Sequence, residues 1–260
     1  MEPARNTASF DCHVVAPGGI APESREVIEE RPLRIVIDGK PAATLMRTPG
    51  DEIELATGFL FTEGIVASPR QVGAVEFYRG QSSQESDEVS ITLARSDPAG
   101  QTDSTDKLNR PFQQRPDRLS AEQVFLVRET MFAAQELFRR TGAAHAAAIA
   151  ELPFGGAETA IVCEDLRRHN ALDKAVGAAL RRGLQLDRSL LFLSSRLSYD
   201  MVAKAARAGI CAVAGVSAPS AAAVRLARRL NMFLTGFARQ QSMTVYSGVE
   251  AVESTEGPAP

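Results

Sequence analysis

The chain has 260 residues, of which 44% are hydrophobic and 23% are charged, a composition typical of a globular protein. Its formal net charge of -3 and pI of about 5.8 show no sign of a nucleic-acid-binding or membrane-binding surface. No apolar run approaches the ~18 residues that a membrane span needs, and the N-terminal sequence MEPARNTASF lacks the apolar core of a signal peptide. Three scattered cysteines without a CxxC motif predict a cytoplasmic protein with no disulfide framework.

The N-terminal region predicts a flexible arm followed by a hairpin. Residues 1–31 show no periodic pattern and are broken by Pro17-Gly18-Gly19, so we interpret them as a flexible N-terminal arm. Two strand patterns, Leu33–Ile37 and Ala43–Met46, then flank Asp38-Gly39, a residue pair favoured in tight hairpin turns. This arrangement predicts a β-hairpin directly after the arm.

A helix and two further strands follow the hairpin. Asp51 is placed to cap a helix, because Glu54 stands three residues later as a capping box requires, and Gly64 provides a stop. The patterns Val72–Tyr78 and Val89–Ala94 predict strands, the second with a clean alternation of apolar and polar residues. These elements predict a small part of the molecule that is rich in β-structure.

A polar segment separates the two halves of the chain. Residues 96–118 contain three prolines and show no hydrophobic period, so we interpret them as a mobile loop that ends a β-rich part at residues 32–118. Ser120 then begins a helix, with Gln123 completing a capping box and Gly142 ending the helix. Five apolar residues, spaced three or four apart, give this helix one buried face. They are Val124, Val127, Met131, Ala134 and Phe138.

The second half begins with a strand at Ala144–Ala150 and then repeats one pattern four times: an apolar run, a polar cluster and an amphipathic segment. Strands that alternate with helices pair in parallel, and parallel strands all end at one edge of their sheet. Ligands of open α/β sheets bind at that edge. The four runs are Thr159–Cys163, Leu190–Leu193, Ala212–Val216 and Met232–Thr235, and the clusters that follow are residues 164–170, 194–198, 217–220 and 236–242.

These clusters place arginine, serine, histidine and asparagine at predicted helix N-termini, where they suit a phosphate-bearing anion. The aromatic ring and guanidinium that follow Gly236 suit a purine-like ring and its phosphate. A purely structural alternative stays open, in which these residues cap helices, with Asn170 as an N-cap and Asp173 three positions later. The binding residues predicted from these patterns are Arg168, His169, Asn170, Ser194, Arg196, Ser217, Ser220, Phe237 and Arg239.

The three cysteines differ in their expected places. Cys163 ends a strand on the predicted ligand edge, which makes it a candidate for a reactive thiol, whereas Cys211 begins a strand and lies at the opposite edge. Cys12 lies in the arm beside His13, whose positive form would favour the thiolate. For all three cysteines, an inert thiol is the structural alternative.

Zinc chemistry is not indicated. His145 is a lone histidine near a strand start, for which a structural role is the simpler interpretation. A zinc-dependent deaminase would need H-x-E at this place and a later PCxxC motif, and the chain has neither. We therefore predict a protein without zinc.

Several stretches together resemble the formate dehydrogenase accessory sulfurtransferase family, FdhD/NarQ. EDLRRHNALDK resembles the family's EDVGRHNAxDK block, and TGAAHAAAI resembles its T-G-G-x-H-x-A-x segment. Other stretches follow in family order, so that the resemblance covers roughly residues 30 to 248. The matching stretches are residues 48–65, 141–149, 164–174, 194–210, 216–220 and 234–239.

The resemblance implies a function and a fold. Proteins of this family pass sulfur, held as a cysteine persulfide, from a cysteine desulfurase to the molybdenum or tungsten bis-guanine-dinucleotide cofactor of formate dehydrogenase. They bind that cofactor, or a guanine nucleotide, as homodimers, and the family's cofactor-binding stretch matches Phe237 to Ser242. The implied fold is α/β, with a cytidine-deaminase-like three-layer α/β/α core at residues 119–248 beside the smaller β-rich N-terminal part. Residues 249–260 are expected to form a disordered tail.

One departure from the family is large. The family carries its sulfur on a CGxCG loop between the strand at Val89–Ala94 and the helix at Ser120–Arg140, and here that interval contains no cysteine. Smaller departures are Arg167 and Ser195, where the family has glycine, and Cys211, where it has proline.

Two hypotheses therefore stand. In the first, the chain is a sulfur carrier that uses a substitute thiolate on Cys163 or Cys12, because the thiolate is the species that carries persulfide sulfur. In the second, it is a non-catalytic relative that binds and delivers the guanine-dinucleotide cofactor or a guanine nucleotide.

Overall fold

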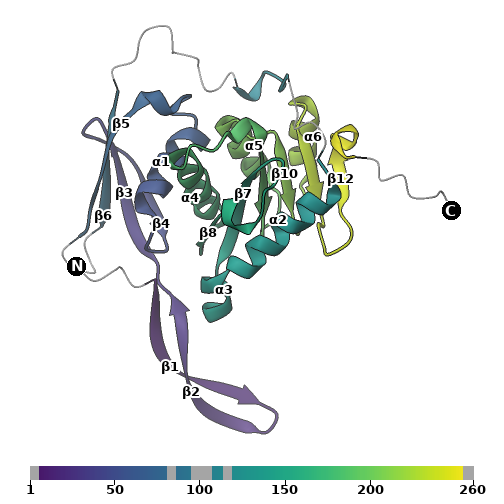
Figure 1. The fold of residues 1–260 in the computed structure, drawn as a ribbon. Helices are drawn as coiled ribbons and strands as arrows, with labels where there is room; N and C mark the ends of the chain where they lie inside the picture. Colours follow the sequence, from purple (N-terminus) through teal and green to yellow (C-terminus); the bar gives the residue numbers. More distant parts are fainter. Residues whose placement is uncertain (1–5, 81–85, 95–106, 114–118, 254–260) are drawn as a thin grey trace, which may run out of the picture.

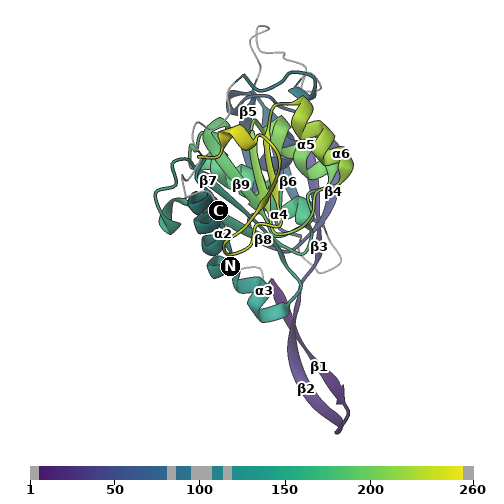
Figure 2. The same ribbon diagram turned by 90° about the vertical axis from the view of Figure 1, so that its right-hand side faces the viewer.

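The computed structural model describes residues 6–80, 86–94, 107–113 and 119–253. In these residues the chain forms a mixed α/β fold with three sheets of two, four and six strands, which confirms the predicted α/β class. The two-stranded sheet projects as a long ribbon from the body that contains the other two (Figure 1; Figure 2). The likeness of the core to cytidine deaminases stays a prediction.

The N-terminal arm is a β-hairpin, whereas the sequence predicted a flexible arm without regular structure. Strand β1 (Thr7–Ala16) pairs antiparallel with β2 (Gly19–Ile28) through ten residue pairs. At the base of the hairpin, Arg140 of the body donates hydrogen bonds to Glu26 and to Thr7 Oγ1, each at 2.7 Å. Backbone pairing, and not the burial of an apolar face, holds this segment, so its hydrophobic pattern did not reveal it.

The four-stranded sheet has the order β4-β3-β6-β5. The predicted hairpin around Asp38-Gly39 is confirmed, and both turn residues have the positive φ, 48° and 75°, that such a turn requires. The two later strand predictions are confirmed as β5 and β6. The bounds are β3 Arg31–Ile37, β4 Lys40–Arg47, β5 Val72–Tyr78 and β6 Asp87–Leu93.

Helix α1 (Glu52–Thr62) begins where the sequence placed it, but the predicted capping box was wrong. Asp51 adopts a left-handed conformation with a φ of 56°, and its side chain accepts no capping hydrogen bond. Glu52 instead accepts hydrogen bonds from Gly50 N at 2.8 Å and from the buried Arg47 at 2.9 Å. A buried ion pair therefore fixes the chain where α1 begins, although no side chain caps the helix.

The six-stranded sheet has the order β12-β11-β10-β9-β7-β8. Strands β9, β10 and β11 pair in parallel as predicted, but β7 lies antiparallel between β8 and β9. The prediction of parallel pairing was therefore wrong for β8, although two antiparallel steps leave β8 and β9 pointing the same way. The short edge strand β12 was not predicted. The bounds are β7 His145–Glu151, β8 Ile161–Asp165, β9 Ser189–Leu193, β10 Ala212–Gly215, β11 Phe233–Gly236 and β12 Thr244–Ser247.

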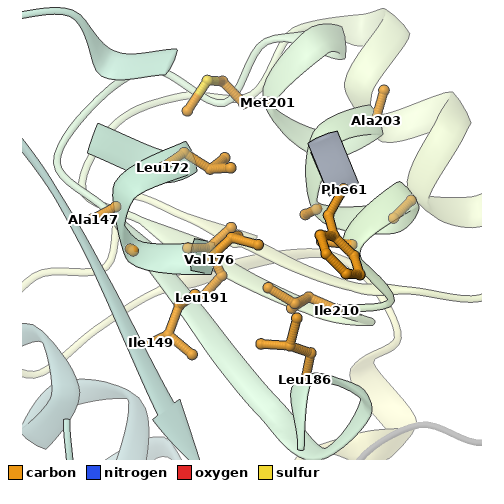
Figure 3. Close-up of a cluster of buried hydrophobic side chains, with 14 of the residues drawn as sticks. Phe61, Ala147, Ile149, Leu172, Val176, Leu186, Leu191, Met201, Ala203 and Ile210 are labelled. Carbon is orange, nitrogen blue, oxygen red and sulfur yellow. The ribbon is translucent and has the colours of Figure 1, made fainter. Parts of the chain in front are cut away.

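Helices cover both faces of this sheet. On one face Ile149 and Leu191 belong to a large apolar cluster with residues of α1, α4 and α5 (Figure 3). The same cluster includes residues of α6 and of the four-stranded sheet. On the other face α2 packs over Ala148 and Phe192. The N-terminal part and the core thus share one hydrophobic cluster. The bounds are α2 Ala121–Ala134, α3 Glu136–Thr141, α4 Arg168–Arg181, α5 Tyr199–Ala208 and α6 Ala221–Arg229.

Two glycines allow α1 and α4 to touch through their backbones. A Cβ atom on Gly58 would lie 1.8 Å from the carbonyl oxygen of Asp173, and one on Gly177 would lie 1.9 Å from that of Glu54. No side chain fits at either position without moving a helix.

The predicted helix from Ser120 begins with its capping box intact, because Ser120 and Gln123 bond to each other's backbone N–H groups. It breaks at Gln135 into α2 and α3, however, and Gly142 ends the second piece. The break leaves Ala134 and Phe138 exposed, so the predicted apolar face was wrong at these two residues.

Two predicted irregular segments are partly ordered. In the predicted loop at 96–118, residues 96–106 and 114–118 lie outside the described residues, but Phe112 N donates to Leu230 O at 2.9 Å. In the predicted tail, Leu119 N donates to Ala251 O at 2.9 Å and Glu253 N donates to Leu119 O at 3.1 Å. The tail prediction was therefore wrong for residues 249–253, and residues 254–260 lie outside the described part.

Candidate ligand-binding edge of the six-stranded sheet

The polar clusters gather at one edge of the sheet, because β8, β9, β10 and β11 all run in the same direction. The segments after β9, β10 and β11 are also hydrogen-bonded to one another. Leu197 N donates to Ala218 O at 3.2 Å, and Phe237 N donates to Ser217 O at 3.3 Å. We call this edge the exit rim, and it comprises residues 164–170, 194–198, 217–220 and 236–242.

The antiparallel strand β7 adds a histidine to the exit rim. His145 begins β7 and pairs with Asp165 at the end of β8. Its Nδ1 lies 3.5 Å from Ser194 Oγ, which also accepts a hydrogen bond at 2.8 Å from the backbone N–H that follows His145. Burial, and then the positive charges of Arg168 and Arg196, lower the pKa of His145. A neutral imidazole therefore lies near two guanidinium groups.

His145 is not among the residues that the sequence predicted to bind a ligand. A histidine at the start of a strand lies at the entry edge of a parallel sheet, away from the strand exits. Only the reversed direction of β7 brings His145 to the exit rim.

The exit rim carries positive charge and helix N-termini. Arg168 is the first residue of α4, where the helix dipole adds positive potential, and Arg196 is exposed before α5. Ser198 precedes α5, and its Oγ is buried without a hydrogen-bond partner among the described residues. An anion with hydrogen-bonding oxygens would satisfy both the charges and this hydroxyl.

Asn170 does not cap α4, so that prediction was wrong. The helix begins at Arg168, and Asn170 is a buried residue of its first turn. Its Nδ2 donates to Met46 O at 2.8 Å and to Asp165 Oδ1 at 3.1 Å. Asn170 therefore joins the rim to β4 and is not available to a ligand.

His169, beside it, is half-buried. Burial, followed by the positive charges of Lys204 and Arg168, lowers its pKa, while the negative charges of Asp200 and Glu63 act in the opposite direction. His169 is therefore neutral at pH 7, and it can offer a hydrogen bond but no charge.

A buried ion pair that sequence analysis missed holds the start of the rim. Lys174 and Asp165 are 1% and 0% exposed, and Lys174 Nζ lies 2.9 Å from Asp165 Oδ2. Lys174 also donates to Thr48 O at 2.9 Å, and Asp165 Oδ1 accepts from Arg167 N at 2.9 Å. The only signal in the sequence is a charged pair at the two ends of the EDLRRHNALDK stretch.

A second buried ion pair joins three helices. Asp173 of α4 accepts hydrogen bonds from Lys204 of α5 at 2.8 and 3.0 Å and from Thr62 of α1 at 2.7 Å. Burial of both side chains excludes contact with a ligand. The conspicuous polar residues after His169 are thus structural.

The last rim segment combines an exposed ring with an exposed guanidinium. Phe237 has a positive φ of 49° and is 38% exposed, whereas Ala238 is fully buried and cannot present its side chain. Arg239 N donates to Ser242 O at 2.8 Å, which closes a turn in which Arg239, Gln240, Gln241 and Ser242 are all exposed. Five of the six predicted residues in this segment can therefore meet a ligand.

The predicted serines also differ in whether they can meet a ligand. Ser220 caps α6, since its Oγ accepts a hydrogen bond from Ala223 N at 3.1 Å, so the structural alternative fits this residue. Ser217 is partly exposed, and its carbonyl oxygen accepts a hydrogen bond from Phe237 N at 3.3 Å. Ser194 lies beside His145, as described above.

All three cysteines lie in described residues, and none forms a disulfide. Burial raises the pKa of the Cys163 thiol to about 12, so this cysteine is protonated at neutral pH. It lines a cavity of about 780 Å³ beside β8 and a second cavity of about 400 Å³ that also touches Glu164 and Lys174. Cys211 is buried and lies before β10 at the opposite edge, while Cys12 is partly exposed on β1. The structure therefore does not support Cys163 as a reactive thiolate.

Within the described part of the chain, no group of three or more His, Cys, Asp or Glu side chains is placed to hold a metal ion. The predicted absence of zinc stays a prediction. None of the helices in the described ranges is both long enough and apolar enough for a membrane crossing.

The fold and the exit rim define a mixed α/β protein with a positively charged strand-exit edge that suits an anionic ligand. Within this class, the chain belongs to the FdhD/NarQ family, because the model of that family matches residues 28–253. The resemblance found in the sequence is thereby confirmed.

Individual relatives agree with this assignment. The chain is 34% identical to the sulfur carrier protein FdhD of Streptomyces coelicolor, over 90% of this chain and 92% of the relative. It is 38% identical to the sulfur carrier protein FdhD of Anaeromyxobacter dehalogenans, over 87% and 88%. A crystal structure from Desulfotalea psychrophila, described as a candidate formate dehydrogenase accessory protein, has the same fold, with a TM-score of 0.80 at 22% identity over 96% of this chain and 100% of that one.

Proposed function

We propose that this chain is an accessory protein of formate dehydrogenase maturation that binds a molybdenum or tungsten bis-guanine-dinucleotide cofactor, or a guanine nucleotide, at the exit rim. The cofactor is a substrate that the protein holds and passes on. The observation that carries the proposal is that Arg168, Arg196 and His145 gather at the strand exits, close enough for the two positive charges to lower the pKa of His145. Membership of the FdhD/NarQ family supports the choice of ligand.

The residues of the rim fit such a ligand. Arg168 and Arg196 would hold diphosphate oxygens, and the unpartnered Ser198 hydroxyl would donate a further hydrogen bond. Phe237 would stack on the guanine, with Arg239 beside it. His145 and Ser194 would orient a phosphate without adding charge.

Sulfur transfer is the second part of the family's function, and here the chain departs from it. Residues 96–118 contain no cysteine, and the Cys163 thiol stays protonated with a pKa of about 12. We therefore favour a protein that binds and delivers the cofactor without carrying sulfur on either of these segments. Of the other two thiols, Cys211 is buried and Cys12 is partly exposed, so a sulfur carrier would act through Cys12.

Calorimetric titration with GDP tests the binding site. We expect Arg196→Ala and Arg239→Ala each to weaken binding by about ten- to a hundredfold, because a hydrogen bond to a charged group contributes about 1.5–3 kcal/mol. Arg25→Ala is the matched control, since Arg25 is an exposed, ion-paired arginine on the hairpin, away from the rim. Unchanged GDP affinity in both rim variants would contradict nucleotide binding at the exit rim.

A persulfide assay separates the two functions. The protein is incubated with a cysteine desulfurase and cysteine, and its intact mass is measured. In a working carrier, the Cys12 thiolate would attack the outer sulfur of the donor's persulfide, and the donor would leave as its thiolate. We expect no adduct; an adduct that Cys12→Ser abolishes would restore sulfur transfer to this chain, and one that Cys163→Ser abolishes would contradict the role of burial.

We further propose formate dehydrogenase as the partner and, as the family resemblance implies, a homodimer. A cysteine desulfurase is a partner only if the persulfide assay is positive. The cytoplasmic location stays a prediction.

A further inference from the structure

The N-terminal hairpin exposes large apolar side chains that no described residue covers. Phe10 is 58% exposed, and Val15 and Ile20, which pair near the turn, are 74% and 70% exposed. The ribbon projects from the body in both views (Figure 1; Figure 2). A two-stranded ribbon is marginally stable in water, whereas three or more strands with an apolar face are stable. These features indicate that further strands complete the hairpin.

The outer edge of β1 is the better place for another strand. Helix α3 packs beside β2 at the base of the hairpin, where Arg140 binds Glu26. Pro22 interrupts β2 and has no N–H to donate to a neighbouring strand. Strand β1 has no proline, and its outer side has no neighbouring strand among the described residues. An unpaired edge of this length is a ready template for strand pairing.

We propose that β1 pairs antiparallel with β1 of a second copy of the chain, about a twofold axis at Cys12, to form a four-stranded sheet. The sequence of β1 is complementary to itself about this residue. Phe10 would lie opposite the partner's Val14, and Asp11 would lie opposite the partner's His13. Aromatic side chains opposite β-branched ones, and acidic side chains opposite basic ones, are favourable pairs in a sheet.

The same sequence disfavours the neighbouring registers. A twofold axis through the sheet permits only shifts that move the axis from one residue to another. Moving the axis to Asp11 places two carboxylates opposite each other, and moving it to His13 places two imidazoles opposite each other. With the axis at Cys12, the apolar residues Phe10 and Val14 of both copies share one face of the new sheet. The Arg25–Glu23 ion pair, with a distance of 3.0 Å, lies at the outer side of that face.

This inference shares with the proposed function only the expectation of a homodimer. It assigns the contact to residues 7–16, which precede the region matched by the family model. GDP binding measured on the same samples reports separately on the exit rim.

Sedimentation velocity of the full chain over a range of concentrations tests the dimer. We expect Phe10→Lys to weaken dimerisation at least tenfold. Val249→Lys serves as the matched control, because Val249 is 66% exposed on the body and lies away from the hairpin. Both positions are exposed, so neither variant disturbs the core. A wild-type chain that stays monomeric, or a dimer that Phe10→Lys leaves unchanged, would overturn the proposal.

Disulfide trapping tests the register. Directly opposed residues of an antiparallel pair have Cα atoms about 4.5–5.5 Å apart, within the range of about 4.4–6.8 Å that disulfides span. Copper(II) phenanthroline, which accepts the two electrons while the two thiols release their protons, should join two copies through Cys12, and Cys12→Ser should abolish the product. In the Cys12→Ser background, Asp11→Cys should crosslink with His13→Cys when the two variants are mixed. Crosslinking of Asp11→Cys with itself at an equal or greater yield would overturn the register.

Discussion

Lys174 holds the first rim segment in place, and its replacement tests how strongly a buried ion pair supports the ligand site. Lys174 Nζ lies 2.9 Å from Asp165 Oδ2, and both residues are almost completely buried. The substitution Lys174→Met keeps the apolar stem but leaves the Asp165 carboxylate without its cation. The carboxylate then stays buried beside the backbone of Thr48, which connects the rim to the N-terminal part.

The structure sets the size of the effect. Removing one partner of a buried ion pair costs about 3–5 kcal/mol. Asp165 keeps hydrogen bonds from Thr48 N at 3.0 Å, Arg167 N at 2.9 Å and Asn170 Nδ2 at 3.1 Å, so we expect the lower end, a loss of about 3 kcal/mol in the free energy of unfolding. Arg167→Met is the matched control. The ion pair of Arg167 with Glu30 is exposed, and its loss should cost about 0–1 kcal/mol.

Urea unfolding followed by far-UV circular dichroism measures this difference, since the chain has no tryptophan. With a denaturant dependence of about 2–3 kcal/mol per molar urea, the midpoint of Lys174→Met should fall by about 1 M or more. Equal midpoints for Lys174→Met and Arg167→Met would refute the reasoning. That result would mean that water or another side chain compensates the buried Asp165 carboxylate.

Four further predictions rest on the described contacts. Replacing Arg168 with alanine should raise the pKa of His145 toward its usual 6.5, as followed by NMR titration. An unchanged pKa would show that the charge of Arg168 does not act on His145. The His145 side chain binds a proton more readily in the unfolded chain than in the folded chain, so the free energy of unfolding should fall as the pH drops below about 6.5. A midpoint of thermal unfolding that rises on acidification would contradict this direction. In the native protein at pH 8, iodoacetamide should modify Cys12 but not Cys163, as read by peptide mass mapping, and equal modification would show that the Cys163 thiol is accessible. Gly58→Ala should lower the free energy of unfolding by about 3 kcal/mol, the upper end of overpacking effects, because its new Cβ would meet a backbone oxygen; an unchanged thermal midpoint would disprove the close contact of α1 and α4.

Local chemistry predicted those elements whose stability is local. The turn at Asp38-Gly39 and the capping box at Ser120 and Gln123 are short-range features, and both are confirmed. The hairpin of β1 and β2 escaped prediction because its strands pair without burying an apolar face. The break at Gln135 escaped because the apolar spacing continues across it.

The exit rim shows how far strand direction alone can place a site. The predicted segments do meet at one edge, since the run-and-cluster pattern fixes where each strand ends. The pattern could not show that Asn170 turns inward to Met46, or that Ala238 is buried. Those outcomes depend on residues more than 100 positions away or on the opposite face of the sheet, which no local window contains.

The order of apolar runs, turn residues and helix caps determined by itself that this chain forms an α/β protein with polar segments at its strand ends. Such features act between neighbours in the chain, and therefore they can be predicted from the sequence. The tertiary structure alone decided that β7 inserts in the reverse direction and brings His145 to the edge that carries Arg168 and Arg196. It also decided which polar side chains became buried ion pairs, because the loss of water around a charge depends on what distant segments pack against it.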